Sequence, residues 1–326
     1  MNPDIASIRK QVLSSDNYSK TWLIPNDLYG WFISLKIFIP FLFVVIMTPI
    51  CYEKYQNSPY LYLVLLVSFF SLGIFAYKFS FLLHETCHYT LFKSKKTNEL
   101  VGTFAGFFSG TNYEIYKFIH MLHHKWNGEL QDPQIDDCLN RSARRTKKQL
   151  LVHLLEPLLF GRLISFISHY FTFLPDKFKT QYEYQKDPNM PKSGLSFYLG
   201  VFVCQVLIVL AITKFFQFPF LALLYPFAAV LISLFLARVR AIVEHTRAND
   251  ILDKDFTRSH KFNFFEEFIL YEANFNFHFE HHVFPQMPSF YLPRFNKQFF
   301  DILHPSKKTF ANSMIGTIFN CYKSFD

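Results

Sequence analysis

Eight histidines fall into three short boxes whose spacing is typical of metal ligands. The first box is His-x-x-x-His, and the other two are both His-x-x-His-His. Their members are His84 and His88, then His120, His123 and His124, then His278, His281 and His282. Residues three and four apart share one face of a helix, about 5 to 6 Å between Cβ atoms, so each box would present its imidazoles together. With only 13 histidines in 326 residues, chance explains two copies of the longer box poorly.

Eight imidazoles are more than a single tetrahedral zinc ion can use. The number fits a centre with two metal ions, or one crowded six-coordinate ion, better. Imidazole binds iron, copper, zinc and nickel alike, so the ligand types by themselves leave the metal open.

The composition indicates a membrane protein. Hydrophobic residues make up 51% of the chain and aromatic residues 20%, far from the average soluble domain. Four apolar stretches have the length of about 20 residues that crosses a bilayer. They are residues 31–51, 60–83, 195–213 and 216–237. The predicted fold is therefore an all-α integral membrane protein with four transmembrane helices in two hairpins. Lys36 and Lys78, near span ends, are expected to reach the interface.

The distribution of basic residues predicts the orientation of these spans. Both hairpin links are almost uncharged, whereas the region between the hairpins is rich in lysine and arginine, from Lys93 to Lys148. The positive-inside rule places that region in the cytosol, and with it both termini and all three boxes. We therefore expect a multi-pass protein whose active site lies in a cytosolic helical cap that carries the boxes. The membrane would be a bacterial inner membrane or the endoplasmic reticulum.

The chain is expected to form one membrane domain, residues 31–294, between cytosolic tails at 1–30 and 295–326. Two further apolar runs, 100–110 and 150–174, are predicted to lie in the membrane interface. The first is too short to span, and the second contains charged residues. No cleavable signal is predicted at the N-terminus. Five cysteines without a Cys-x-x-Cys pair argue against a disulfide framework.

The sequence around the third box extends the comparison beyond the histidines. It reads NFNFHFEHHVFP over residues 274–285 and is followed by Leu292-Pro293-Arg294. This segment, the order of the boxes and the interval between the second and third resemble the membrane fatty acid desaturase superfamily, the histidine-box di-iron enzymes. Within it, the segment is similar to the desaturase branch rather than to the sterol-type hydroxylases. The resemblance covers about residues 31–294.

The resemblance implies that the eight box histidines bind two iron ions, with O2 as co-substrate. It also implies a ninth ligand after the last span, and His245 occupies that position. Four side chains beside these histidines could orient a ligand or a water, as groups around a metal commonly do. They are Asn274, Glu85, Glu244 and Glu280; for Asn274 a helix cap is the alternative. No catalytic residue separate from the metal ligands is expected.

The remaining histidines are predicted to be structural because none has a partner at ligand spacing. They are His153, His169, His260 and His304. Three aspartates follow the second box, Asp132, Asp136 and Asp137. They could accept the outer ring N–H of a ligand or solvate the surface.

The resemblance implies an oxidoreductase that introduces a carbon–carbon double bond into a fatty acyl or related lipid chain, carried by a lipid, CoA or a carrier protein. Removing hydrogen from an unactivated carbon needs an oxidant that no side chain supplies, which favours a redox metal with O2. The chain has neither a His-Pro-Gly-Gly nor a Gly-x-Gly-x-x-Gly fingerprint. Electrons are therefore expected from an external donor, such as cytochrome b5 or ferredoxin with its reductase. The bilayer and the acyl substrate are the other expected partners, and nucleic acid is not one.

Three alternatives remain open at this stage. A hydroxylase or ketolase of the same fold would use the same ligands, and a desaturase of a small non-lipid metabolite would differ only in its substrate pocket. A non-catalytic metal carrier is the third. Transporters place polar ligands at the bilayer midplane, whereas these boxes fall just beyond the predicted span ends, which disfavours that reading.

Overall fold

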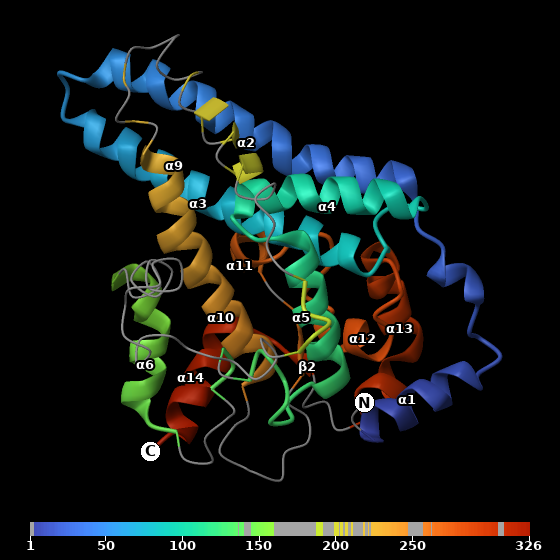
Figure 1. Cartoon of the computed structure of the whole chain (residues 1–326). Coiled ribbons are helices and arrows are strands. Elements are labelled where there is room, and N and C mark those ends of the chain that lie inside the picture. The colour runs from blue at the N-terminus through green and yellow to red at the C-terminus, as the bar shows by residue number, and fades with distance from the viewer. Residues whose placement is uncertain are drawn as a thin grey trace.

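The computed structural model of the chain is predominantly helical (Figure 1). It describes residues 3–326 except 136, 140–144, 160–186, 192–198, 202, 205, 208–209, 211–217, 219–220, 222, 247–256, 262 and 306–309.

The elements of the first half are α1 (Pro3–Leu13), the 3-10 turn η1 (Lys20–Leu23), α2 (Asp27–Tyr55), α3 (Tyr60–Cys87), α4 (Lys95–Ser109), α5 (Tyr113–Trp126), α6 (Lys147–Leu155) and the 3-10 turn η2 (Glu156–Leu159). Those of the second half are α9 (Leu224–Ala228), the π-helical turn η6 (Ala229–Ser233), α10 (Leu234–His245), β1 (Ser259–His260), α11 (Phe264–Leu270), α12 (His278–Val283), the 3-10 turn η7 (Ser289–Tyr291), α13 (Leu292–Leu303), β2 (Phe310–Ala311) and α14 (Met314–Ser324).

Three helices in the described part of the chain are long and apolar enough to cross a membrane. They are α2, α3 and the continuous helix Leu224–His245, which comprises α9, η6 and α10. The first two agree with the predicted spans at 31–51 and 60–83 and continue beyond them, because the flanking residues keep helical hydrogen bonds. The predicted span at 195–213 lies largely outside the described residues.

The last predicted span, 216–237, overlaps the candidate span Leu224–His245. This helix continues past residue 237, so His245 is its last residue, whereas several of residues 216–223 lie outside the described part of the chain. The apolar face continues past residue 237 through the buried side chains of Val239, Ile242 and Val243. Arg238 lies among these apolar residues. Its charge is paired with Glu156, with Nη2 3.5 Å from Oε2, and the helix continues past it.

The helices α2 and α3 form the apolar spine of the molecule, at the top of Figure 1. They are joined by residues 56–59 and share one buried cluster, in which Phe41 meets Phe79 edge to face at 5.4 Å between ring centroids. Their outer faces expose large apolar side chains such as Phe43 and Leu63. A contiguous apolar surface of this kind is typical of contact with lipid.

The third long helix crosses α3 at a small residue. A Cβ added to Gly73 would lie 2.4 Å from the Cβ of Ile232 and 2.9 Å from the carbonyl oxygen of Ala228. Small residues permit close approach of helix backbones where no hydrophobic effect drives association. Ile232 belongs to the π-helical turn η6, so the crossing lies where the helix is locally widened.

An ion cluster around the buried Glu272 ties the spine to the segment before the third box. Glu272 accepts from Lys36 at 2.5 Å and from Lys78 at 2.9 Å. Lys78 is only 4% exposed, so the expectation that its amine reaches the interface is wrong. Its charge is compensated inside the protein by Glu272, which is more favourable than an isolated buried amine.

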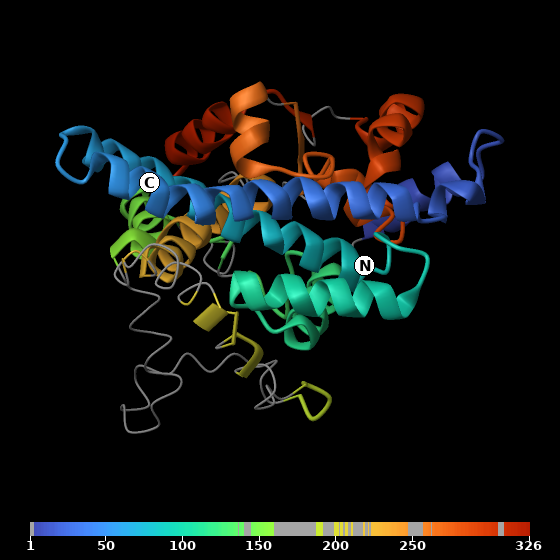
Figure 2. The ribbon, with the colours of Figure 1, turned by 90° about the horizontal axis from the view of Figure 1, so that it is seen from above.

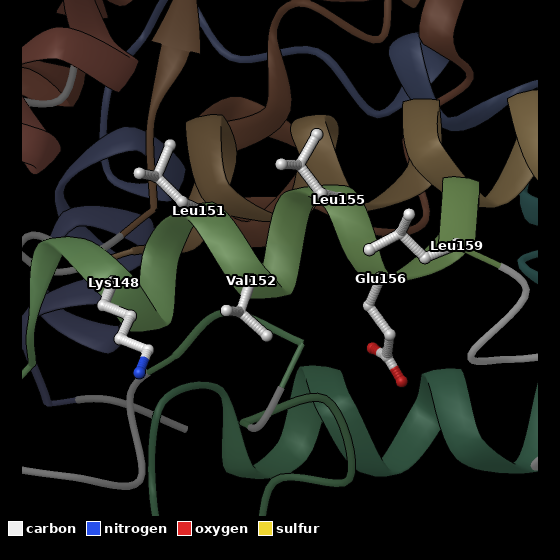
Figure 3. Close-up of a pocket in the computed structure, with 6 residues that line it drawn as sticks. All are labelled: Lys148, Leu151, Val152, Leu155, Glu156 and Leu159. Carbon is white, nitrogen blue, oxygen red and sulfur yellow. The ribbon is translucent and has the colours of Figure 1, made fainter.

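The two predicted interfacial runs each include a helix with one apolar exposed side. In α4, Ala105 and Phe108 are buried, whereas Leu100 and Phe104 are exposed; Figure 2 shows α4 beside the spine. On α6 and η2, Leu151 and Leu155 point to one side, and Lys148, Val152 and Glu156 to the other (Figure 3). These five residues, with Leu159, line a shallow apolar surface hollow. Of the predicted run at 150–174, residues 160–174 lie outside the described residues.

The predicted tails pack onto the part of the chain that carries the histidines. In the N-terminal segment, Ile5 and Val12 of α1 join a buried cluster with Val283 of α12 and Phe295 of α13. In the C-terminal segment, α14 packs on α6 and α10. The parallel bridge between β1 and β2 pairs Ser259 with Phe310. Both ends of the chain therefore help to hold the box-bearing helices (Figure 1).

Replacing Gly73 by alanine tests the crossing of α3 with the third span. The added methyl group would overlap Ile232, and overpacking of this kind costs about 1 to 3 kcal/mol. We expect a lower midpoint of thermal unfolding in detergent. The control is Gly316→Ala, whose Cβ would meet only the Ser313 side chain, at 3.1 Å. Equal midpoints for the two variants would contradict the close crossing.

His260 gives a pH test of the fold. Burial, with a smaller effect from Arg258, lowers the pKa of His260 to about 3, below the value of about 6.5 in an unfolded chain. Folding therefore favours the neutral ring, and its contribution to stability is complete above pH 6.5 and declines as the pH falls. Relative to His260→Gln, the wild-type chain should lose up to about 1.4 kcal/mol per pH unit below 6.5. Parallel profiles from pH 8 to 4 would disprove the assignment.

Candidate metal centre

Nine histidines converge from four helix segments. His84 lies in the last turn of α3 and His88 directly follows that helix. The second box lies on α5 and the third on α12, and His245 is the last residue of α10. The prediction that the boxes lie on helices is confirmed for the second and third, while the first crosses the end of its helix.

A first group contains five histidines: His84, His88, His120, His124 and His281. One ring nitrogen from each lies within 4.8 Å of those of the others. The Nε2 of His120 is 2.9 Å from that of His88 and 3.0 Å from that of His124. The Nε2 of His281 is 3.0 Å from that of His124.

A second group contains four histidines: His123, His245, His278 and His282. Ring nitrogens of His123, His245 and His282 lie within 4.8 Å of one another. The Nε2 of His278 is 2.8 Å from that of His245 and 3.1 Å from that of His282. The rings of His124 and His282 are 4.4 Å apart between centroids, so the two groups adjoin.

Asp132 holds one ring of the second group. The Nδ1 of His123 lies 2.9 and 3.0 Å from the two carboxylate oxygens of Asp132. The carboxylate also accepts from the backbone N–H of Gly128 and of Gln134, each at 2.9 Å. This contact fixes the proton of His123 on Nδ1 and leaves Nε2, which is buried without a hydrogen-bond partner in the described structure, free to bind a metal.

Burial favours the neutral form of six of these histidines, and metal ligation requires that form. Burial, with a smaller effect from His123, lowers the pKa of His88 to about 3. Burial is also the main cause that lowers the pKa well below the ordinary value in His120, His124, His278, His281 and His282. Burial alone would raise the pKa of Asp132, but the neighbouring His123 and the two backbone N–H groups bring it below its usual value.

The spacing of the nitrogens fits metal ions. With metal–nitrogen distances of about 2.1 Å, adjacent ligands are about 3.0 Å apart in an octahedron and about 3.4 Å apart in a tetrahedron. The five measured separations between Nε2 atoms range from 2.8 to 3.1 Å. Hydrogen bonds between the rings do not give every ring nitrogen a partner, because both ring nitrogens of His84 are buried without one in the described structure.

The carboxylates and the amide predicted to assist the metal lie in different places. Glu244 faces the second group, with Oε2 3.4 Å from the Nε2 of His278 and Oε1 2.8 Å from the Nε of Arg240. Glu85 accepts from the backbone N–H of Ser289.

Glu280 points to the opposite side of α12. It hydrogen-bonds to Ser259, Asn296 and His304. The side chain of Asn274 donates to the Ser289 carbonyl, and the residue that caps α12 is Phe277, so the alternative of a helix cap is wrong.

Two residues beside the second group were not found from the sequence. The amide Nδ2 of Asn127 is 3.2 Å from the Nδ1 of His282 and 2.8 Å from the Oγ1 of Thr257. That oxygen is 3.4 Å from the Nδ1 of His245. Asn127 stands four residues after His123, a helical spacing that could have indicated it, whereas nothing in the sequence marks Thr257.

The other histidines that the structure describes lie outside both groups. His153 contacts the Asp137 carbonyl at 2.9 Å, His260 lies 3.5 Å from Thr317, and His304 bonds to Glu280. His169 and Asp136 lie outside the described residues.

Replacing Asp132 by asparagine should weaken metal binding. The amide keeps the size of the side chain but loses one of the two oxygens that face His123. Loss of such a partner typically reduces metal affinity 10- to 100-fold. Competition with a chelator measures the affinity, and Glu129→Gln is the control, because Glu129 is exposed and the same charge is removed. Equal affinities in the two variants would contradict the role of Asp132.

Comparison with known proteins agrees with this geometry. None of the curated proteins compared with the chain matches it. The family model described as fatty acid desaturase matches residues 60–311, a range that covers more than three quarters of the chain and contains all nine histidines. The chain therefore belongs to the fatty acid desaturase family.

Proposed function

We propose that this protein is an O2-dependent desaturase that introduces a carbon–carbon double bond into an acyl chain. The family implies a membrane oxidoreductase that acts on lipid chains, and the proposal goes further to a di-iron centre and to desaturation. The observation that carries it is the convergence of nine buried or half-buried imidazoles in two adjoining groups at the ends of apolar helices.

The two groups would each hold one iron ion. The nitrogen separations close to 3.0 Å favour six-coordinate ions, whereas structural zinc is almost always tetrahedral. Bound iron supplies, with O2 and external electrons, the oxidant that removes hydrogen from an unactivated carbon. The histidines bind and orient the ions, and Asp132 keeps the proton of His123 on the outer nitrogen.

The surroundings of the first group suit an apolar substrate. The ring of Phe275 is 4.3 Å from that of His84, and Phe81 lies next to Phe275 at 5.3 Å. Both rings are fully buried, and such an apolar wall excludes water from the first group, which would protect reactive species from side reactions.

The place of the site relative to the helices supports the proposed topology. His84 and His245 stand at the ends of the two helices that also form candidate spans, so the centre would lie at the boundary between membrane and cytosol. Lys93, Lys95 and Lys96 follow His88 closely in the sequence. Positive charge near this face suits an acidic electron donor such as cytochrome b5 or ferredoxin.

Product analysis of His281→Ala tests the function. His281 belongs to the first group. Loss of a residue that only hydrogen-bonds to a metal ligand typically reduces activity 10- to 100-fold, so we expect loss of a ligand itself to reduce it by more than about 100-fold. The chain and the variant would be expressed in a host membrane with a donor and reductase, and lipids and polar metabolites compared by mass spectrometry.

The matched control is His153→Ala, which removes a histidine outside both groups. A product two hydrogens short that depends on His281 and not on His153 would support desaturation. A product with an added oxygen atom would instead assign hydroxylation. If supplied donor, reductase and acyl lipids yield neither product while the protein is folded and loaded with iron, the proposed reaction is wrong.

A further inference from the structure

The outer ring nitrogens of the two histidine groups have different surroundings. In the second group, Nδ1 of His123 faces Asp132, Nδ1 of His282 faces Asn127, and Nδ1 of His245 faces Thr257. In the first group, the corresponding Nδ1 atoms of His84, His120 and His281 are buried without a hydrogen-bond partner among the described residues. In the second group this holds only for Nδ1 of His278, so three of its four ligands have a polar partner at the outer nitrogen.

Asn127 and Thr257 form one continuous link between two ligands. An imidazole that binds metal through Nε2 carries its proton on Nδ1 and needs an acceptor there. The two orientations of an asparagine amide are distinguished by the hydrogen bonds that they allow. In the structure the amide nitrogen of Asn127 faces both Thr257 and His282, and the amide oxygen has no partner among the described residues. Turning the amide by 180° would place its oxygen there, so that His245 donates to the Thr257 hydroxyl, Thr257 donates to the Asn127 oxygen, and His282 donates to the same oxygen.

The charges are distributed in the same unequal way. Asp132 and Glu244, both buried, lie against the second group. Glu244 is paired with Arg240, whose Nε lies 2.8 Å from Oε1, so its charge is largely compensated there. Asp132 contacts the second group through His123, and its carboxylate therefore attracts a cation to the second position.

We propose that the two metal positions are inequivalent, and that the second group binds its ion first and more tightly than the five-histidine group does. Asn127 and Thr257 act as positioning residues for His282 and His245. The inference rests on the proposed function to the extent that two ions bind, and it adds the order in which they bind.

Titration of the metal-free protein with cobalt(II) in detergent tests the order. Imidazole sites accept cobalt as well as iron, and its visible absorption reports the ligands without any enzymatic turnover. We expect two resolved binding steps in the wild-type chain. After dialysis against a weak chelator, one equivalent should remain, as measured by elemental analysis.

Four variants identify the tighter step. Asn127→Leu and Thr257→Val remove the polar atoms with little change in volume, and each should weaken the first step 10- to 100-fold while the second is unchanged. Asn127→Asp and Thr257→Ser keep an oxygen at the same place and should restore it. Thr317→Val is the matched control, since Thr317 is also buried and lies beside a histidine, His260, outside both groups.

The outcomes separate this inference from the proposed function. Two ions of equal affinity in a chain that forms the unsaturated product would overturn only the inequivalence. A failure of all cobalt binding by folded protein would overturn both proposals. Weakening of the later step in Asn127→Leu, or no restoration by Asn127→Asp and Thr257→Ser, would contradict the positioning role. If Asn127→Leu does not fold, Thr257→Val interrupts the same link and gives the decision.

Discussion

The nine imidazoles impose the constraint on which the rest of the structure depends, because their nitrogens are aimed at one another in a region with little water. Nε2 atoms about 3 Å apart, such as those of His120 and His124 at 3.0 Å, bring lone pairs together, and buried polar groups without partners destabilise a fold. A bound cation would satisfy these nitrogens together. Metal affinity and folding would then be coupled, and the scaffold would hold the rings in place before an ion arrives.

The scaffold meets this demand by anchoring each box to a different part of the molecule. The first box ends α3, whose other residues form the apolar spine with α2. The segment before the third box is tied to that spine by Glu272, which binds Lys36 and Lys78. The third box itself is held from its outer side, where Glu280 meets Ser259, Asn296 and His304 in a buried network. Because these anchors join segments that are far apart in the sequence, the arrangement of the centre depends on long-range contacts as well as on its own helices.

The sequence predicted the helical class, two spans and the histidines that converge, because spacing on a helix and apolar length are local properties. It did not predict the direction of Glu280, which stands inside a box but faces His304, since a helix of six residues offers both a metal side and a core side. Lys78 was expected at the interface because it lies near the end of a predicted span; its partner Glu272 is 194 positions away in the sequence and no local pattern indicates it. Thr257 was missed for the same reason: only tertiary structure brings it to Asn127. Local patterns thus identified the ligands, and long-range contacts determined what orients them.

The π-helical turn at Ala229–Ser233 has a consequence for how this family member can change. A turn of this kind adds one residue to an α-helix and rotates everything that follows by about 100°. Exposed apolar residues before the turn, such as Phe227, and the residues of the histidine cluster after it, Glu244 and His245, therefore face directions that depend on this extra residue. Loss of one residue from the turn would leave every histidine box intact in sequence, yet swing the end of α10 to another face. A search for the histidine motifs alone would not detect this change. The number of residues between Ile232, which packs on Gly73, and His245 therefore determines where this histidine lies.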